Sequence, residues 1–153
     1  MRLLLTEMLR AIGVRNIFEA IDGAEALHMM RRVPIDIVIT DLKMGLLGGI
    51  EFVKLLRRSP DSPNPFAPVL MVTGHSTMRR VQDARDAGVN EFLTKPVTGR
   101  GLVHRLTQLI DQPRPFIRCE GYFGPDRRRH VAAGYKGPWR RDEDAISIDS
   151  DFG

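Results

Sequence analysis

The stretch that most constrains the fold of this chain is residues 35–44, with the sequence IDIVITDLKM. Its first half is rich in β-branched side chains such as Ile35, Ile37 and Val38, a composition typical of a buried parallel strand. The run ends at a carboxylate, Asp41. Ligands bind at the carboxyl ends of strands in an open α/β sheet, so Asp41 is a candidate nucleophile or metal ligand. Taken alone, an aspartate at a strand end more often caps the next turn.

The rest of the chain alternates between two kinds of hydrophobic pattern. Apolar residues at helical spacing predict helices over residues 6–11, 24–30, 50–58, 78–87 and 102–110. Short β-branched or apolar runs predict strands over residues 16–20, 35–40, 69–72 and 91–93. Strands that alternate with helices predict an α/β fold, a doubly wound parallel sheet with helices on both faces and right-handed crossovers.

Three consecutive predicted strands end in polar side chains: Asp41, Thr73 and Lys95. Adjacent parallel strands lie about 4.8 Å apart, so these three groups can meet at one edge of the sheet. A single strand-end threonine or lysine is usually a turn residue or a solvated charge. The occurrence of all three at successive strand ends favours a shared site.

A carboxylate, a hydroxyl and an ammonium at one edge suit phosphoryl transfer. Asp41 would attack phosphorus and become an acyl phosphate. Lys95 and the Thr73 hydroxyl would contact the phosphoryl oxygens, and Mg²⁺ would neutralise the remaining charge.

The sequence around these residues resembles the receiver domain of bacterial two-component response regulators. The resemblance is carried by VITDLKM with Asp41, MVTGHS with Thr73, and EFLTKP with Lys95. Gly49, eight positions after Asp41, and Phe92, three before Lys95, also match. It spans residues 1–112, which we expect to form the receiver domain.

The resemblance implies the flavodoxin-like receiver fold, with strand order 2-1-3-4-5. It implies that Asp41 accepts a phosphoryl group from a histidine kinase or phosphotransfer protein, and that Lys95 binds the phosphate. Thr73 and Phe92 would be the switch pair, and Asp41 with the backbone carbonyl of Lys43 would contact Mg²⁺. Such a receiver is a cytoplasmic signalling module, not an enzyme, and acts through an output protein.

The chain departs from the family pattern in two places. Gly45 stands where the family usually has proline. More seriously, receivers begin with a strand ending in an acidic pair that binds Mg²⁺, and this chain starts inside the following helix. In the family order the missing strand would lie between those predicted at residues 16–20 and 35–40. We expect either a wrong start or truncated fragment, which we favour, or a degenerate, metal-poor receiver.

Residues 113–153 differ in composition from the rest. Pro, Gly and Arg dominate and aliphatic residues are few, so we expect a disordered tail. A pattern recurs in it, GPDRR at residues 124–128 and GPWRR at 137–141. As a docking segment, its Tyr122, Phe123 and Trp139 could stack on a protein or nucleic-acid partner. No helix-turn-helix pattern fits, so direct DNA regulation is not expected.

Other classes of function fit less well. No apolar run approaches the roughly 20 residues of a membrane span. The single cysteine, Cys119, excludes an internal disulfide and fits a reducing compartment. A phosphatase of the haloacid dehalogenase type needs a second Asp two residues after the nucleophile, and that position is Lys43. A phosphorylation-independent interaction module stays open, and Mg²⁺ binding by the full-length product would distinguish it from a working receiver.

Overall fold

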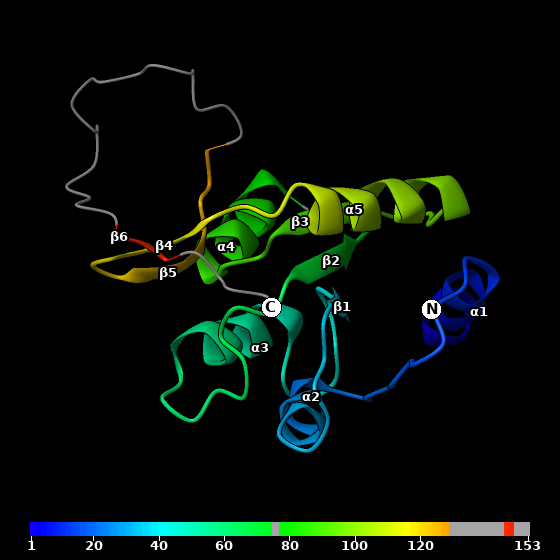
Figure 1. The fold of residues 1–153 in the computed structure, drawn as a ribbon, viewed down its shortest axis with the longest axis horizontal. Coiled ribbons are helices and arrows are strands. Elements are labelled where there is room, and N and C mark those ends of the chain that lie inside the picture. The colour runs from blue at the N-terminus through cyan, green and yellow to red at the C-terminus, as the bar shows by residue number, and fades with distance from the viewer. Residues whose placement is uncertain (75–76, 129–145, 149–153) are drawn as a thin grey trace.

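The computed structural model describes residues 1–74, 77–128 and 146–148 (Figure 1). The helices in this part are α1 (Arg2–Ala11), α2 (Gly23–Met30), α3 (Gly49–Arg58), α4 (Met78–Ala87) and α5 (Gly99–Asp111). The strands are β1 (Val38–Asp41), β2 (Val69–Thr73), β3 (Glu91–Thr94), β4 (Phe116–Cys119), β5 (Tyr122–Pro125) and β6 (Ile146–Ile148).

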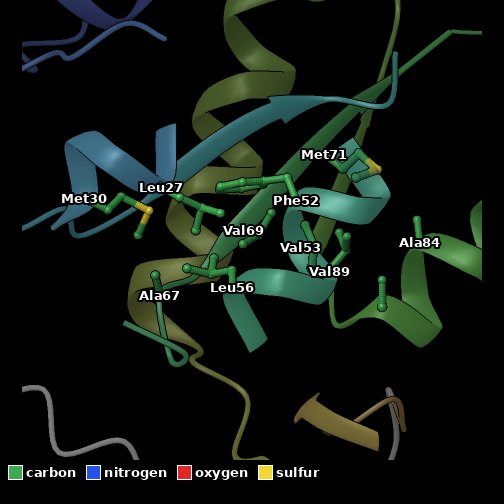
Figure 2. Packing of buried hydrophobic residues seen from close by; sticks show 11 residues of the cluster. Leu27, Met30, Phe52, Val53, Leu56, Ala67, Val69, Met71, Ala84 and Val89 are labelled. Atoms are coloured by element: carbon green, nitrogen blue, oxygen red, sulfur yellow. The ribbon is translucent and has the colours of Figure 1, made fainter. Parts of the chain in front are cut away.

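The strands β1, β2 and β3 form a parallel sheet in that order, and every residue of the central β2 is buried. Side chains alternate between the faces of this strand. Val69 and Met71 pack with residues of α2, α3 and α4, whereas Leu70 and Val72 pack with α5 and the inner side of α1. Figure 2 shows the first of these clusters, gathered against β2. The prediction of a doubly wound parallel sheet is confirmed.

Helix ends follow their sequence signals. The side chain of Asp22 accepts a hydrogen bond from the backbone N–H of Glu25 at 2.9 Å and caps α2. Thr77 and Thr98 cap α4 and α5 in the same manner. Gly88 follows α4 with a φ of 110°, a left-handed conformation that favours glycine at a helix end. These local signals explain why most predicted helices agree with the structure to within a few residues.

The predicted strand at residues 16–20 is wrong, because residues 14–20 form no strand. A strand needs a hydrogen-bonded neighbour, and within the described residues β1 pairs only with β2. In the order 2-1-3-4-5, the neighbour of both segments would be the first strand of the family fold, and the described residues contain no strand before β1. The apolar side chains there consequently remain exposed, Phe18 by 48% and Ile21 by 67%.

The start of β1 also differs from the prediction. Its pairing begins at Val38, opposite Val69, rather than at Ile35. Ile35 instead packs, partly buried, against the apolar cluster on the α2–α3 side of the sheet. The hydrophobic pattern of residues 35–40 therefore predicted their burial correctly. Only the residues from Val38 onward, however, pair with the neighbouring strand.

The expectation of a disordered tail is wrong for residues 116–125. They form the antiparallel hairpin β4–β5, and β6 pairs with the other edge of β4. The rings of Phe116 and Phe123 pack with Phe66, with centroids 5.3–5.7 Å apart. The hairpin lies beside α4 (Figure 1), and this shared aromatic cluster compensates for the scarcity of aliphatic residues.

Burial also corrects the proposed docking role of the tail aromatics. Tyr122 and Phe123 are 6% and 5% exposed, so their rings are not free to stack on a partner. Trp139 and the second GPxRR pattern lie outside the described residues.

Candidate functional site

The parallel register brings the predicted site residues to one edge of the sheet. Asp41 pairs with Val72, the residue before Thr73, and Thr73 pairs with Thr94, the residue before Lys95. The carboxyl ends of all three strands therefore meet where the sequence predicted a shared site.

The centre of this site is an ion pair between Asp41 and Lys95. The Lys95 Nζ donates to Asp41 Oδ2 at 2.7 Å, a short charge-assisted hydrogen bond. The other oxygen, Oδ1, accepts the backbone N–H of Lys43 at 3.1 Å. The side chains of Asp41 and Lys95 are 25% and 31% exposed, so a solute can reach the carboxylate.

The loop after Asp41 is held close to the strand by glycine. A Cβ on Gly49 would overlap the carbonyl oxygen of Asp41, so only glycine allows α3 to begin at this position. The N–H of Gly49 donates to the carbonyl of Leu42 at 3.3 Å, which closes the loop. Gly45 lies in the middle of this loop and is exposed.

Thr73 and Phe92 lie on neighbouring strands. Thr73 is 3% exposed, and its carbonyl accepts the N–H of Lys95 at 2.7 Å. Phe92 pairs with Met71 in the register, and its half-buried ring packs against the α2–α3 cluster. Thr73 therefore ends the strand beside Asp41, and Phe92 lies on the strand that leads to Lys95. Their role as a switch stays a prediction.

The donors at the site do not fit Mg²⁺. This cation requires several oxygen ligands, usually including more than one carboxylate or a phosphate. No group of three His, Cys, Asp or Glu side chains in the described residues could hold a metal ion. Asp41 already accepts hydrogen bonds from the Lys95 ammonium and from the N–H of Lys43. The predicted metal contacts of Asp41 and of the Lys43 carbonyl thus lack a complete donor set.

One structurally central residue escaped the sequence prediction. Arg57 lies in the last turn of α3, and it is only 3% exposed. Its guanidinium donates to the carbonyls of Gly88, Pro65 and Ala67 and to Asn90 Oδ1, at 2.7–3.1 Å. Burial lowers the pKa of Arg57 to about 9. The available signal was its position four residues after Val53, on the apolar side of the helix.

Comparisons with known proteins agree with this geometry. The family model described as the response regulator receiver domain matches residues 1–107. The chain is 34% identical over 112 residues to the chemotaxis protein CheY-3 of Vibrio cholerae, which covers 73% of this chain and 85% of that protein. It is 32% identical to the chemotaxis protein CheY of Pseudomonas aeruginosa over 112 residues, 73% of this chain and 89% of the relative.

Solved structures show the same fold. CheY4 of Vibrio cholerae superposes with a TM-score of 0.64 at 29% identity, covering 71% of this chain and 88% of that one. The receiver domain of a sensor histidine kinase from Pseudomonas aeruginosa has a TM-score of 0.64 at 22% identity, covering 72% and 88%. That structure has a magnesium ion coordinated in its active-site cleft. In the described part of the present chain, no helix is long and apolar enough to cross a membrane.

Proposed function

We propose that this chain, which belongs to the response regulator receiver domain family, accepts a phosphoryl group on Asp41 and signals through protein contacts. The observation that carries the proposal is the pair of Asp41 and Lys95, 2.7 Å apart at the carboxyl ends of parallel strands and open to solvent. The donor would be a phosphohistidine of a histidine kinase or phosphotransfer protein.

In the transfer step, a carboxylate oxygen of Asp41 attacks the phosphorus atom. The P–O bond forms as the P–N bond to the imidazole breaks, and the imidazole keeps the bonding electron pair and takes up a proton. The product is an acyl phosphate. Lys95 is placed to move from the carboxylate to a phosphoryl oxygen, which would stabilise the charge transferred to the receiver. Because the described donors do not fit Mg²⁺, no step is assigned to a metal.

Thr73 and Phe92 would report the phosphoryl group to the rest of the domain. A phosphoryl group can shift a conformational equilibrium only through contacts that differ between the two states. The Thr73 hydroxyl, on the strand beside Asp41, would make such a contact, and the half-buried ring of Phe92 would turn inward in response. The output partner would be a protein, and we propose neither catalytic turnover nor direct DNA binding.

A second candidate is a phosphorylation-independent interaction module. The observation that favours it is the single carboxylate of the site, which leaves the described residues without the donor set of a magnesium-dependent receiver. The phosphatase alternative gains no support, because an exposed lysine, Lys43, occupies the position of the required acid.

The test is to incubate the full chain with acetyl phosphate and Mg²⁺ and to measure the intact mass. We expect wild type to gain one phosphoryl group and Asp41→Asn to gain none. Asp36→Asn is the matched control, because Asp36 is an exposed carboxylate in the same segment and should leave labelling unchanged. Labelling that persists in Asp41→Asn would refute the assignment, and a folded wild type that takes no label would favour the second candidate.

A further inference from the structure

We propose that the C-terminal hairpin, residues 114–128, is a regulated arm of the receiver that loosens when Asp41 is phosphorylated. This inference rests on the proposed function, because it requires a phosphoryl group at Asp41. It goes further by naming a segment beyond the family match at residues 1–107 as the element that responds.

The first attachment of the hairpin is to the start of β3. Arg114 donates to Glu91 Oε1 at 2.7 Å, and Arg105 of α5 donates to Oε2 at 3.2 Å. The side chain of Glu91 is only 8% exposed, so this ion pair is largely shielded from water. Loss of Arg114 removes one arginine partner of this buried carboxylate, so its charge is then compensated less well, and the contact is sensitive to a small displacement of either partner.

The second attachment passes through Arg57. Its guanidinium donates to Asn90 Oδ1 at 2.9 Å and lies over the Phe116 ring of β4, 4.9 Å from the centroid. Asn90 Oδ1 also accepts the N–H of Val69, at the start of β2. The Arg57 guanidinium therefore links the hairpin to Asn90, the residue that precedes β3.

The third attachment is to the end of α4. Arg127 forms an ion pair with Asp86. A Cβ on Gly124 would lie 3.0 Å from the Cα of Gly88, so β5 approaches the turn after α4 almost backbone to backbone. Besides the Phe66 ring and a hydrogen bond that Arg58 of α3 donates to the Gly121 carbonyl at 2.9 Å, the hairpin is thus held by α4 and by the beginning of β3.

These two elements, α4 and the start of β3, adjoin the candidate switch residues Thr73 and Phe92 in the chain. Glu91 immediately precedes Phe92, β3 runs on to Lys95, and α4 is the first helix after Thr73. The observed hairpin contacts belong to the state in which Lys95 binds Asp41. If a phosphoryl group draws Lys95 and Thr73 toward itself and Phe92 turns inward, the start of β3 shifts against Arg114. The docked hairpin then loses contacts, so docking and phosphorylation oppose each other.

The test is amide hydrogen exchange of residues 116–125 in the full chain, before and after labelling with acetyl phosphate. We expect these amides to exchange at least about five-fold faster in the labelled wild type, in the range typical of coupled sites. Asp41→Asn, treated identically, should show no acceleration. Labelling is verified by intact mass in the same samples.

A pair of variants tests the assigned contact. Arg114→Met removes the ion pair to Glu91, so its hairpin should exchange faster even unlabelled and respond to labelling by less than about two-fold. Arg118→Met is the matched control, because Arg118 lies on β4, four residues after Arg114, and stacks on the hairpin's own Phe123, and it should keep the full response.

The outcomes separate the two proposals. If wild type takes no label, both are overturned. If it is labelled but its hairpin exchange is unchanged or slower, the coupling is overturned and phosphorylation of Asp41 stands. A full response in labelled Arg114→Met would also overturn the coupling.

Discussion

Arg57 lies at the end of α3, yet its guanidinium joins four separate parts of the chain. It contacts the loop before β2, the turn after α4, the residue before β3 and the Phe116 ring. In the part of the chain that the structure describes, this buried cation has no carboxylate partner, and it is tolerated because oxygen acceptors surround it. At the same scale, Lys95 and Asp41 satisfy each other's charge at 2.7 Å, and under the proposed function a phosphoryl group would compete for the lysine.

Replacing Arg57 should be far more damaging than replacing its neighbour. Arg57→Met leaves buried oxygen acceptors without their donor, each costing about 1–3 kcal/mol, so we expect a loss of about 3 kcal/mol or more in the free energy of unfolding. Arg58→Met, an exposed substitution one residue later, should cost less than about 1 kcal/mol. Urea denaturation measures both, and equal losses would contradict the assigned role.

At the scale of elements, the β4–β5 hairpin is closed by its own side chains. The Tyr122 hydroxyl donates to the carbonyl of Pro125 at 2.7 Å, and Arg127 lies over the Tyr122 ring. Burial raises the pKa of Tyr122 to about 12. The folded hairpin therefore holds the Tyr122 hydroxyl in its neutral form. The free energy of unfolding should for this reason depend on pH in the alkaline range.

Between pH 10 and pH 12 the unfolded chain releases a proton that folded Tyr122 retains, so rising pH favours unfolding through this group. Through this group, the free energy of unfolding at pH 11 is about 1.4 kcal/mol lower than at pH 9. Tyr122→Phe removes this contribution. We expect the unfolding free energy of wild type to fall relative to that of the variant by this amount, measured by urea denaturation at both pH values. A difference that does not change with pH would contradict the buried, neutral phenol.

At the scale of the whole molecule, the hairpin and the parallel sheet share one interior. Phe66 belongs to the loop before β2, whereas Phe116 and Phe123 belong to the hairpin, and the three rings pack together. The described part of the chain should consequently unfold as one unit rather than as a receiver with an independent appendage.

Phe116→Ala tests whether the hairpin and the rest of the receiver unfold together. Removing a buried ring of this size costs about 3–5 kcal/mol, and the loss should appear in the urea transition of the receiver helices, followed by far-ultraviolet circular dichroism. Val103→Ala, on the outer side of α5 and 41% exposed, should change the transition little. If the helices of Phe116→Ala melt at the wild-type urea concentration, the hairpin is an independent unit.

The sequence alone determined the elements whose signals are local. Apolar periodicity located the helices, and short β-branched or apolar runs located β2 and β3, because neighbouring residues decide these features. The convergence of Asp41, Thr73 and Lys95 was also predictable, since the carboxyl ends of parallel strands must share one edge. The 2.7 Å contact between Asp41 and Lys95 then needed only the sheet register.

Tertiary structure decided what depends on partners distant in the chain. The segment at residues 16–20 has strand composition but no strand beside it to share its hydrogen bonds, so it forms no strand. Residues 116–125 belong to a segment rich in Pro, Gly and Arg, yet Phe66 and Arg57 supply from elsewhere the packing partners that this segment itself lacks. The burial of Arg57 likewise depends on carbonyl oxygens up to 31 residues away, and no local pattern encodes their positions.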